Sequence, residues 1–379
     1  MNRFASLLAI LALCVCLQTS AEGGLPAFIK KVGTMIDSMS VSGVDRRYID
    51  APEHPWQLIV KGNMNQSMVK MKSRGEMVGI PFSATPSLKT EPSRYVGLWA
   101  GYRGYGLGYT VNVGGDKGSY LTLGATGGAY GVNVRIHSFN NDTPDFDIST
   151  DFNFEDDEDD HLSGKVELMD PIKVHTLIAD GYYLFNGKHF SYAAAYDQSV
   201  LQKRSAGSLM AGAMYYYGHI NYATHHNGDL IYMMHGLGGV KLWQGSVGVG
   251  YAYNWVPARG LLVSVMAMPM LTMVNKIKAY RYMTNMDELI AQIIFTEDET
   301  SEEEENQWVY DHLRIMPMGT KTFNSGMTLN IDARLSLTYN FGRCFVNAYG
   351  QFNNFRYRHD DSHGHMNDWY VNTSVGVRL

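Results

Sequence analysis

The segment GMTLNIDARLSLTYNF, from Gly326 to Phe341, alternates between apolar and polar residues along its whole length. A period of two places the apolar and the polar set on opposite faces of an extended strand. Four other segments repeat the pattern, and they span residues 107–113, 130–137, 246–255 and 371–379. The pattern predicts an all-β protein built from antiparallel strands.

Two environments produce such alternation. One is a soluble sheet over an apolar core, and the other is a membrane barrel whose apolar face meets lipid and whose polar face lines a wet lumen. Aromatic residues at strand ends, as at Tyr253 and Trp255, favour the membrane, because barrels carry aromatic girdles at both interfaces. The final strand resembles the C-terminal signal of outer-membrane barrels, although that signal prefers an aromatic residue and this chain has Leu379.

The connections between strands fall into two classes. If the last strand runs toward the periplasm, NFGR, VPARG and the hairpin turn Asn186-Gly187 lie on the inner side. The long polar connections then lie outside, and they are NDTPDFDISTDFNFEDDEDDH, NYATHHNGD, TEDETSEEEEN and RHDDSHGHMND. Short periplasmic turns and long outer loops characterise single-chain barrels. We therefore predict a closed antiparallel transmembrane β-barrel of about 12 strands, within a range of roughly 10 to 14. A soluble periplasmic sandwich or lipocalin-like barrel is the alternative.

The N-terminal residues predict export. Residues 1–21 have the features of a cleavable signal peptide, with Arg3 before an apolar stretch and small residues up to Ala21. Residues 22–55 are expected to form a periplasmic segment with a short amphipathic helix over 25–38, and residues 56–379 the barrel. The expected location is the bacterial outer membrane. Only Cys344 remains after cleavage, so no internal disulfide is expected.

The composition agrees with this class. The chain has 39 Gly, 25 Tyr and only 18% charged residues, which suits strands and tight turns. Its 37 acidic residues exceed its 31 basic ones, giving a net charge of -6, which disfavours nucleic-acid binding. Outer-membrane lipid is the expected partner, together with a small or hydrophobic solute.

One strand is apolar on both faces. In LLVSVMAMPMLTMV, Leu261, Val263 and Val265 lie on one face and Leu262, Met266, Met268 and Met270 lie on the other, so the face toward the lumen is apolar too. Either an internal plug, such as Phe190 to Val200, packs on this face, or the lumen holds a hydrophobic molecule.

Charged residues also face the expected lumen. They are Arg135, His137, Asp332 and Arg334. They could line a pore or form a salt-bridge network that braces the barrel.

Other candidate sites lack the features that their chemistry needs. The acidic runs over 145–160 and 297–305 suit solvated loops or cation binding, but the nearest calcium-type loop lacks its Gly and its bidentate Glu. The histidines of 359–365 lack a rigid support. Gly104, Gly106 and Gly108 suit a bend or close packing in the wall, since no helix follows them. The sequence thus indicates no catalytic, cofactor-binding or metal-binding residue and no cofactor.

Several stretches carry a family resemblance. They are VDRRYIDAPEHPW, YVGLWAGYRGYGLGYTVNV, YLFNGKHFSYAAAYDQSVLQKRSAGSLMAGAMYYY and SVGVGYAYNWV, with QKRSAGS (Gln202 to Ser208) the most specific. From about Val44 to Leu379 the chain resembles an uncharacterised family of Bacteroidetes outer-membrane proteins, family 4421 of the domains of unknown function. The resemblance implies an outer-membrane barrel but no ligand or reaction.

These observations leave three functions open. The first is a non-enzymatic channel, narrow or plugged, or a binding protein for a small or hydrophobic solute. The second is an outer-membrane lipid hydrolase, in which a Ser and a His would meet on the barrel wall. The third is an adhesion or structural barrel that acts through its acidic loops.

Overall fold

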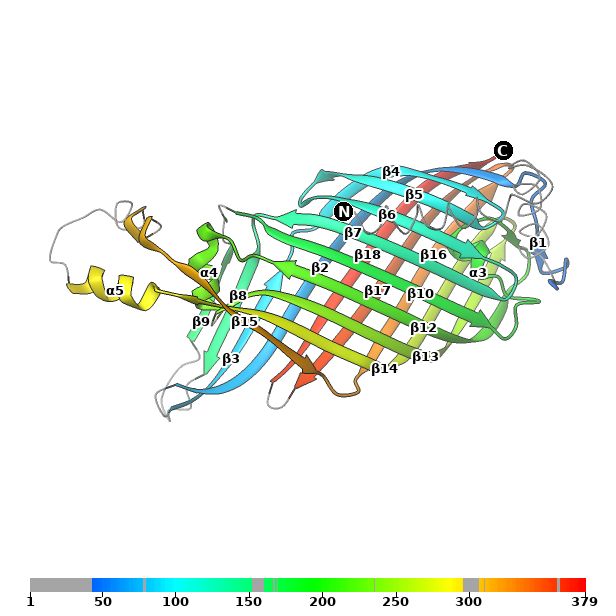
Figure 1. The fold of residues 1–379 in the computed structure, drawn as a ribbon. Helices are drawn as coiled ribbons and strands as arrows, with labels where there is room; N and C mark the ends of the chain where they lie inside the picture. Colours follow the sequence, from blue (N-terminus) through cyan, green and yellow to red (C-terminus); the bar gives the residue numbers. More distant parts are fainter. Residues whose placement is uncertain are drawn as a thin grey trace, which may run out of the picture.

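The computed structural model describes residues 43–77, 80–151, 160–165, 168, 170–234, 236–295, 307–309, 311–359 and 362–379. The expected signal peptide and the helix expected over 25–38 lie outside these residues. Twelve strands form a closed ring of antiparallel neighbours (Figure 1), which confirms the predicted barrel. In ring order they are β2 (Trp56–Met77), β4 (Ser93–Tyr102), β5 (Tyr105–Gly114), β6 (Lys117–Thr126), β7 (Tyr130–Asn141), β10 (Ile172–Leu184), β12 (Ala206–Asn221), β13 (Leu237–Ala258), β14 (Leu261–Thr284), β16 (Leu329–Phe341), β17 (Cys344–His359) and β18 (Ser362–Arg378). β18 pairs with β2 and closes the ring.

The side chains of the ring are arranged inside out relative to a soluble sheet. Leu335 and Val249 point outward and are 56% and 62% exposed, whereas Asp332 and Arg334 point inward and are 0% and 4% exposed. The apolar set of the alternation thus covers the outside and the polar set fills the lumen. Hydrocarbon rewards this arrangement and water does not. The soluble sandwich or lipocalin-like alternative is therefore wrong.

The two ends of the barrel differ, as the loop lengths predict. One end carries short turns, including Arg259-Gly260 and Gly342-Arg343, in the predicted VPARG and NFGR connections, and we call it the short-turn end. The other end carries the long connections that lead into β4, β10, β13 and β16, and we call it the loop end (Figure 1). One long connection, residues 185–205 between β10 and β12, belongs to the short-turn end. The loop end bears β3 (Ile80–Lys89), β8 (Asp145–Asp151), β9 (Asp160–Lys165), η2 (His225–Asn227), α4 (Gly228–Met233), α5 (Met286–Phe295) and β15 (Ile315–Asn324). Within the described ranges, no helix is both long and apolar enough to cross a membrane.

The glycines of β5 and β6 make room for one indole. A Cβ atom at Gly106 or Gly108 would lie 2.5 or 2.8 Å from the inward-facing side chain of Trp99. A Cβ atom at Gly124 on the next strand would lie 2.8 Å from the same ring. These distances are shorter than real carbon contacts, so the wall needs glycine here. The interpretation of these glycines as sites of close packing is confirmed.

Candidate functional site

Residues 186–205, between β10 and β12, fold into the lumen, and we call them the plug. They contain α3 (Tyr192–Tyr196) and β11 (Leu201–Gln202). Ser191 caps α3 by accepting a hydrogen bond from the Ala194 amide at 3.1 Å. Phe190, a plug residue, is 0% exposed. The plug expected over Phe190 to Val200 is confirmed. The plain hairpin expected at Asn186-Gly187 is wrong, because the turn directs the chain inward and the next barrel strand begins only at Ala206.

Side chains on the lumen face of three strands hold the plug. Each of them donates a hydrogen bond to a plug carbonyl oxygen, which a buried carbonyl requires. The bonds are Asn254 Nδ2 to Ser191 O (2.8 Å), Ser336 Oγ to Ala195 O (2.6 Å) and Arg378 Nη2 to Gln198 O (2.8 Å). β13, β16 and β18 belong to one run of neighbouring strands in the ring, and Gln57 of β2 also donates to Asp197 O at 3.2 Å, so several strands hold the plug in the lumen at the short-turn end.

Residues 45–50, which precede the barrel, contact the plug. β1 (Ile49–Asp50) pairs with β11, and Ile49 packs in a cluster with the alanines of α3. Asp45 donates its amide hydrogen to the Lys188 carbonyl at 2.9 Å. The Arg47 guanidinium, hydrogen-bonded to Asp45, holds the pKa of that carboxyl well below its usual range. Part of the expected 22–55 segment therefore lies against the plug.

The apolar lumen face of β14 meets both the plug and the space above it. Leu262 belongs to the cluster of α3 alanines and Val200. Met266, Met268 and Met270 are 0–1% exposed and belong to a second cluster, which joins plug residues to inward side chains of other strands. This face thus supports the plug and continues into an apolar part of the lumen.

A network of buried charges lies above the plug. Arg334 Nη2 lies 3.0 Å from Asp332 Oδ2 and 3.1 Å from Asp180 Oδ2, and all three side chains are at most 2% exposed. Tyr182 donates to Asp332 at 2.5 Å, and Arg334 Nη1 donates to Tyr192 of the plug at 2.5 Å. We call these five residues the interior network. Of the two readings of Asp332 and Arg334, the bracing salt-bridge network is confirmed.

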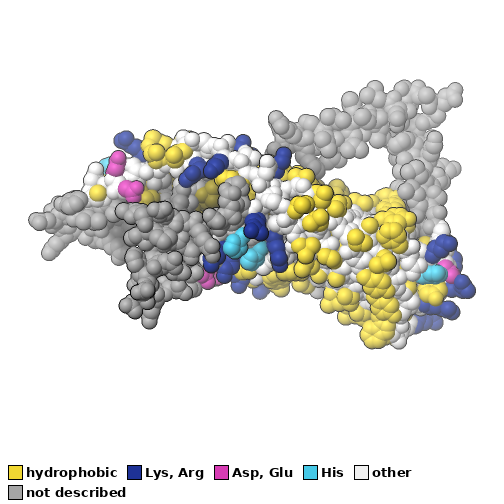
Figure 2. All heavy atoms as spheres, turned by 90° about the horizontal axis from the view of Figure 1, so that it is seen from below, with side chains coloured by type: hydrophobic (Ala, Val, Ile, Leu, Met, Phe, Trp, Pro, Cys, Tyr) yellow, Lys and Arg dark blue, Asp and Glu magenta, His cyan; other side chains and the backbone are white. Residues whose placement is uncertain are grey.

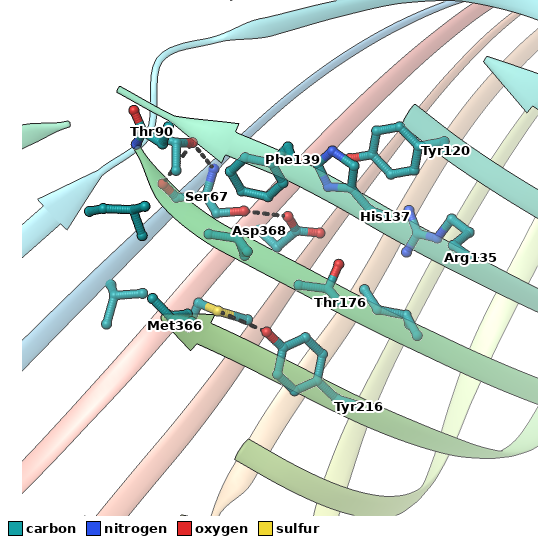
Figure 3. A pocket seen from close by; sticks show the side chains of 16 residues that line it. Ser67, Thr90, Tyr120, Arg135, His137, Phe139, Thr176, Tyr216, Met366 and Asp368 are labelled. Carbon is teal, nitrogen blue, oxygen red and sulfur yellow. Dashed lines mark hydrogen bonds between the residues drawn. The ribbon is translucent and has the colours of Figure 1, made fainter. Parts of the chain in front are cut away.

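Arg135 and His137 line a cavity of about 60 Å³ on the loop-end side of this network, which we call the Arg135 cavity (Figure 3). Its polar lining is Ser67, Thr90, Arg135, His137, Asn141, Thr176 and Asp368. Its apolar lining includes Val69, Phe139, Val174, Ile178, Tyr216 and Met366. The cavity is therefore amphipathic. A second cavity of about 70 Å³ lies between Arg135 and the interior network, so the guanidinium borders both spaces.

The wall of the Arg135 cavity is held by contacts among its own side chains. The ring of His137 stacks on Tyr120 at 3.7 Å and on Phe139 at 4.4 Å, between ring centroids. Its Nε2 lies 2.9 Å from the Tyr95 hydroxyl. Ser67 donates to Asp368 at 2.9 Å (Figure 3). These groups are already partnered and keep the cavity in shape.

Arg135 differs from its neighbours. It is 8% exposed, and its guanidinium lies over the ring of Tyr370 at 5.1 Å. Its Nη2 atom has no hydrogen-bond partner among the described residues. Buried polar atoms are normally hydrogen-bonded, so this donor is available to a ligand.

The other candidates do not assemble into sites. In the described part of the chain, no three His, Cys, Asp or Glu side chains gather as metal ligands. His363 and His365 pair in register with Arg358 and Arg356, which disfavours a cation beside them. The acidic runs lie partly outside the described residues, at 152–159 and 296–306.

The sequence did not point to Asp180, Tyr182 or Asp368. Their strands carry polar and apolar residues on the same lumen face, as in Ile178, Asp180, Tyr182 and Leu184. The signal that could have found them is their position on the face opposite the lipid-facing apolar residues. That signal can be used only once a barrel has been assumed.

Residues 44–378 match the family described as Domain of unknown function (DUF4421). The chain belongs to this family. With its inside-out ring of twelve strands, this DUF4421 protein is an outer-membrane β-barrel. No curated protein matches the chain significantly.

Several solved outer-membrane structures are similar to the DUF4421 chain. The translocator domain of the autotransporter NalP from Neisseria meningitidis has 9% identity and a TM-score of 0.34, covering 93% of this chain and 97% of that one. The COG4313 outer membrane channel from Pseudomonas putida F1 has 9% identity and a TM-score of 0.30, covering 86% and 97%. OprG from Pseudomonas aeruginosa has 10% identity and a TM-score of 0.25, covering 86% and 97%. No function carries over at these values.

Proposed function

We propose that this barrel is a non-enzymatic binding protein for a small, partly hydrophobic solute that carries an acidic group. The observation that supports it is the buried guanidinium of Arg135 with an unpartnered donor beside a cavity. Burying a charge without a full set of partners is costly. A carboxylate would accept the free donor, since its geometry matches a guanidinium. The apolar wall would contact the rest of the solute.

The plug favours binding over open conduction. It fills the lumen at the short-turn end and is fastened to strands β13, β16 and β18. A solute in the Arg135 cavity would therefore stop there. Passage through the barrel would require the plug to move, so the proposal includes a channel only in that gated form.

Calorimetry with butyrate and butanol tests the proposal. The two molecules have similar carbon chains, but only butyrate carries a charge. We expect the unmodified barrel to bind butyrate more tightly, and Arg135→Gln to weaken butyrate roughly tenfold or more while leaving butanol unchanged, because a hydrogen bond to a charged group contributes about 1.5–3 kcal/mol. Arg356→Gln, an exposed arginine on β17, is the matched control. Equal butyrate affinity in the Arg135 variant and the unmodified protein would refute the proposal.

One observation favours a second function, hydrolysis of a membrane lipid. Ser138 on β7 and His175 on β10 lie opposite one another on the outer wall, with Ser138 Oγ 2.7 Å from His175 Nδ1. A histidine at this distance can take the hydroxyl proton while the serine oxygen attacks an ester carbonyl. This contact supports the second function, which requires a Ser and a His that meet on the wall.

Release of fatty acid from added phospholipid tests this second function. Activity should disappear in Ser138→Ala and persist in Ser119→Ala, which alters the serine opposite it on β6. Activity that survives Ser138→Ala would belong to another site or a contaminant, and absence of any release by the unmodified protein would leave solute binding as the function.

A further inference from the structure

A row of basic residues crosses the outer wall near the loop end. His219 on β12 pairs in register with Lys241 on β13, and Lys241 pairs with Lys278 on β14. Like charges directly opposite one another destabilise a sheet. None of the described outward-facing residues of β10, β12, β13 and β14 is acidic. The wall itself therefore does not neutralise this row.

The two lysines converge on one tyrosine. The ammonium of Lys241 lies 5.2 Å, and that of Lys278 5.3 Å, from the ring centroid of Tyr280. The ring of His219 lies 6.5 Å from the same ring. Two cations and a phenol thus surround one small area of the surface. We call Lys241, Lys278 and Tyr280 the lysine cradle.

The lysine cradle lies at the edge of the lipid-facing belt. Trp243 and Tyr217 lie one row closer to the short-turn end, with ring centroids 5.8 Å apart. Figure 2 shows Lys and His side chains gathered at the boundary of the hydrophobic belt. From Trp243 to Tyr253 on the same strand, ten residues at about 3.3 Å and a tilt near 40° span roughly 25 Å, the height of the apolar band of a barrel. Lys241 therefore lies just outside the hydrocarbon, at the level of lipid headgroups.

We propose that the lysine cradle binds the phosphate group of an anionic membrane lipid whose acyl chains run along Trp243 and Tyr217. A phosphate supplies the negative charge that none of the described neighbouring side chains provides to the paired lysines. Its oxygens accept hydrogen bonds from both ammonium groups and from the phenol. The aromatic pair below it suits the junction of headgroup and acyl chain. This inference is independent of the solute in the lumen, because it concerns only the outer wall.

Native mass spectrometry of the full chain, released from detergent after incubation with defined lipids, tests the proposal. The probes are lipid A with its phosphates, the same lipid without phosphates, and phosphatidylcholine. We expect retention of phosphorylated lipid A only. Replacing Lys241 or Lys278 by glutamine should lower retention by roughly fivefold each, the factor that one surface cation contributes. Lys117→Gln is the control, because Lys117 lies at the same end but pairs with Asp142 at 3.7 Å.

Three results would overturn the proposal. The first is undiminished retention in the Lys241→Gln, Lys278→Gln double variant. The second is equal retention of the lipid without phosphates, which would indicate apolar contact alone. The third is displacement of the lipid by inorganic phosphate at matched concentration, which would indicate a site for a free anion. Migration of unboiled protein in gels establishes that each variant is folded.

Discussion

Replacing Arg334 by methionine should destabilise the barrel strongly. The change removes the guanidinium that lies 3.0 and 3.1 Å from the carboxylates of Asp332 and Asp180. Those carboxylates, 0% and 1% exposed, would stay buried with uncompensated charge. Breaking one side of a buried ion pair costs about 3–5 kcal/mol. Arg334 also bonds to Tyr182 and Tyr192, so we expect the upper part of that range.

Urea unfolding in detergent micelles, followed by tryptophan fluorescence, measures the loss. The triple variant Arg334→Met, Asp180→Asn, Asp332→Asn should recover most of it, because a network replaced as a whole by neutral groups is often close to neutral. Arg356→Met on the outer wall should cost less than about 1 kcal/mol. The reasoning fails if Arg334→Met is as stable as this control, or if the triple variant is no more stable than the single one.

Other predictions concern the turns, the plug and the belt. Burial raises the pKa of Asp116 to about 6 from 3.8, so the free energy of unfolding should fall as the pH rises between those values. In urea titrations, Asp116→Asn should raise the free energy of unfolding by about 1–3 kcal/mol near pH 7.5 and leave it unchanged near pH 4. Replacing residues 190–200 by a Gly-Ser linker should give steady conductance in planar bilayers, while the unmodified barrel stays closed. Leu335→Arg should cost about 2–4 kcal/mol in lipid vesicles. A neutral effect would mean that this face does not meet hydrocarbon.

The alternation predicted the barrel because lipid and lumen impose opposite chemistry on successive residues. The same reasoning fails outside the hydrocarbon. In β15 both faces are exposed, and IMPMGTKTFN has no two-residue pattern. β3, β8 and β9 likewise extend the sheet beyond the ring. These strands could not be predicted because no apolar solvent selects their side chains.

Within the lumen, the sequence predicted contacts only between residues that are close together in the chain. Asp332 and Arg334 are two residues apart on one strand, so they share a face whatever the rest of the fold does. The residues that complete their network are about 150 positions away, on β10 and in the plug. Their approach depends on the closed ring and on the path of the plug. The plug was inferred from Leu262 and the methionines, because an apolar lumen face needs an apolar partner.

The seam between β2 and β18 joins the first and last strands of the barrel. Trp56 and Leu379 exchange backbone hydrogen bonds of 3.2 and 2.9 Å, and side chains along the seam bond across 310 positions of the chain. Until this contact forms, the first and last strands have unpaired backbone N–H and C=O groups, with which hydrocarbon cannot form hydrogen bonds. A nascent chain therefore cannot enter the bilayer hairpin by hairpin at low cost. We therefore expect the slow step of assembly to be the pairing of β2 with β18, and a chaperone or insertase that shields these two edge strands should accelerate assembly most.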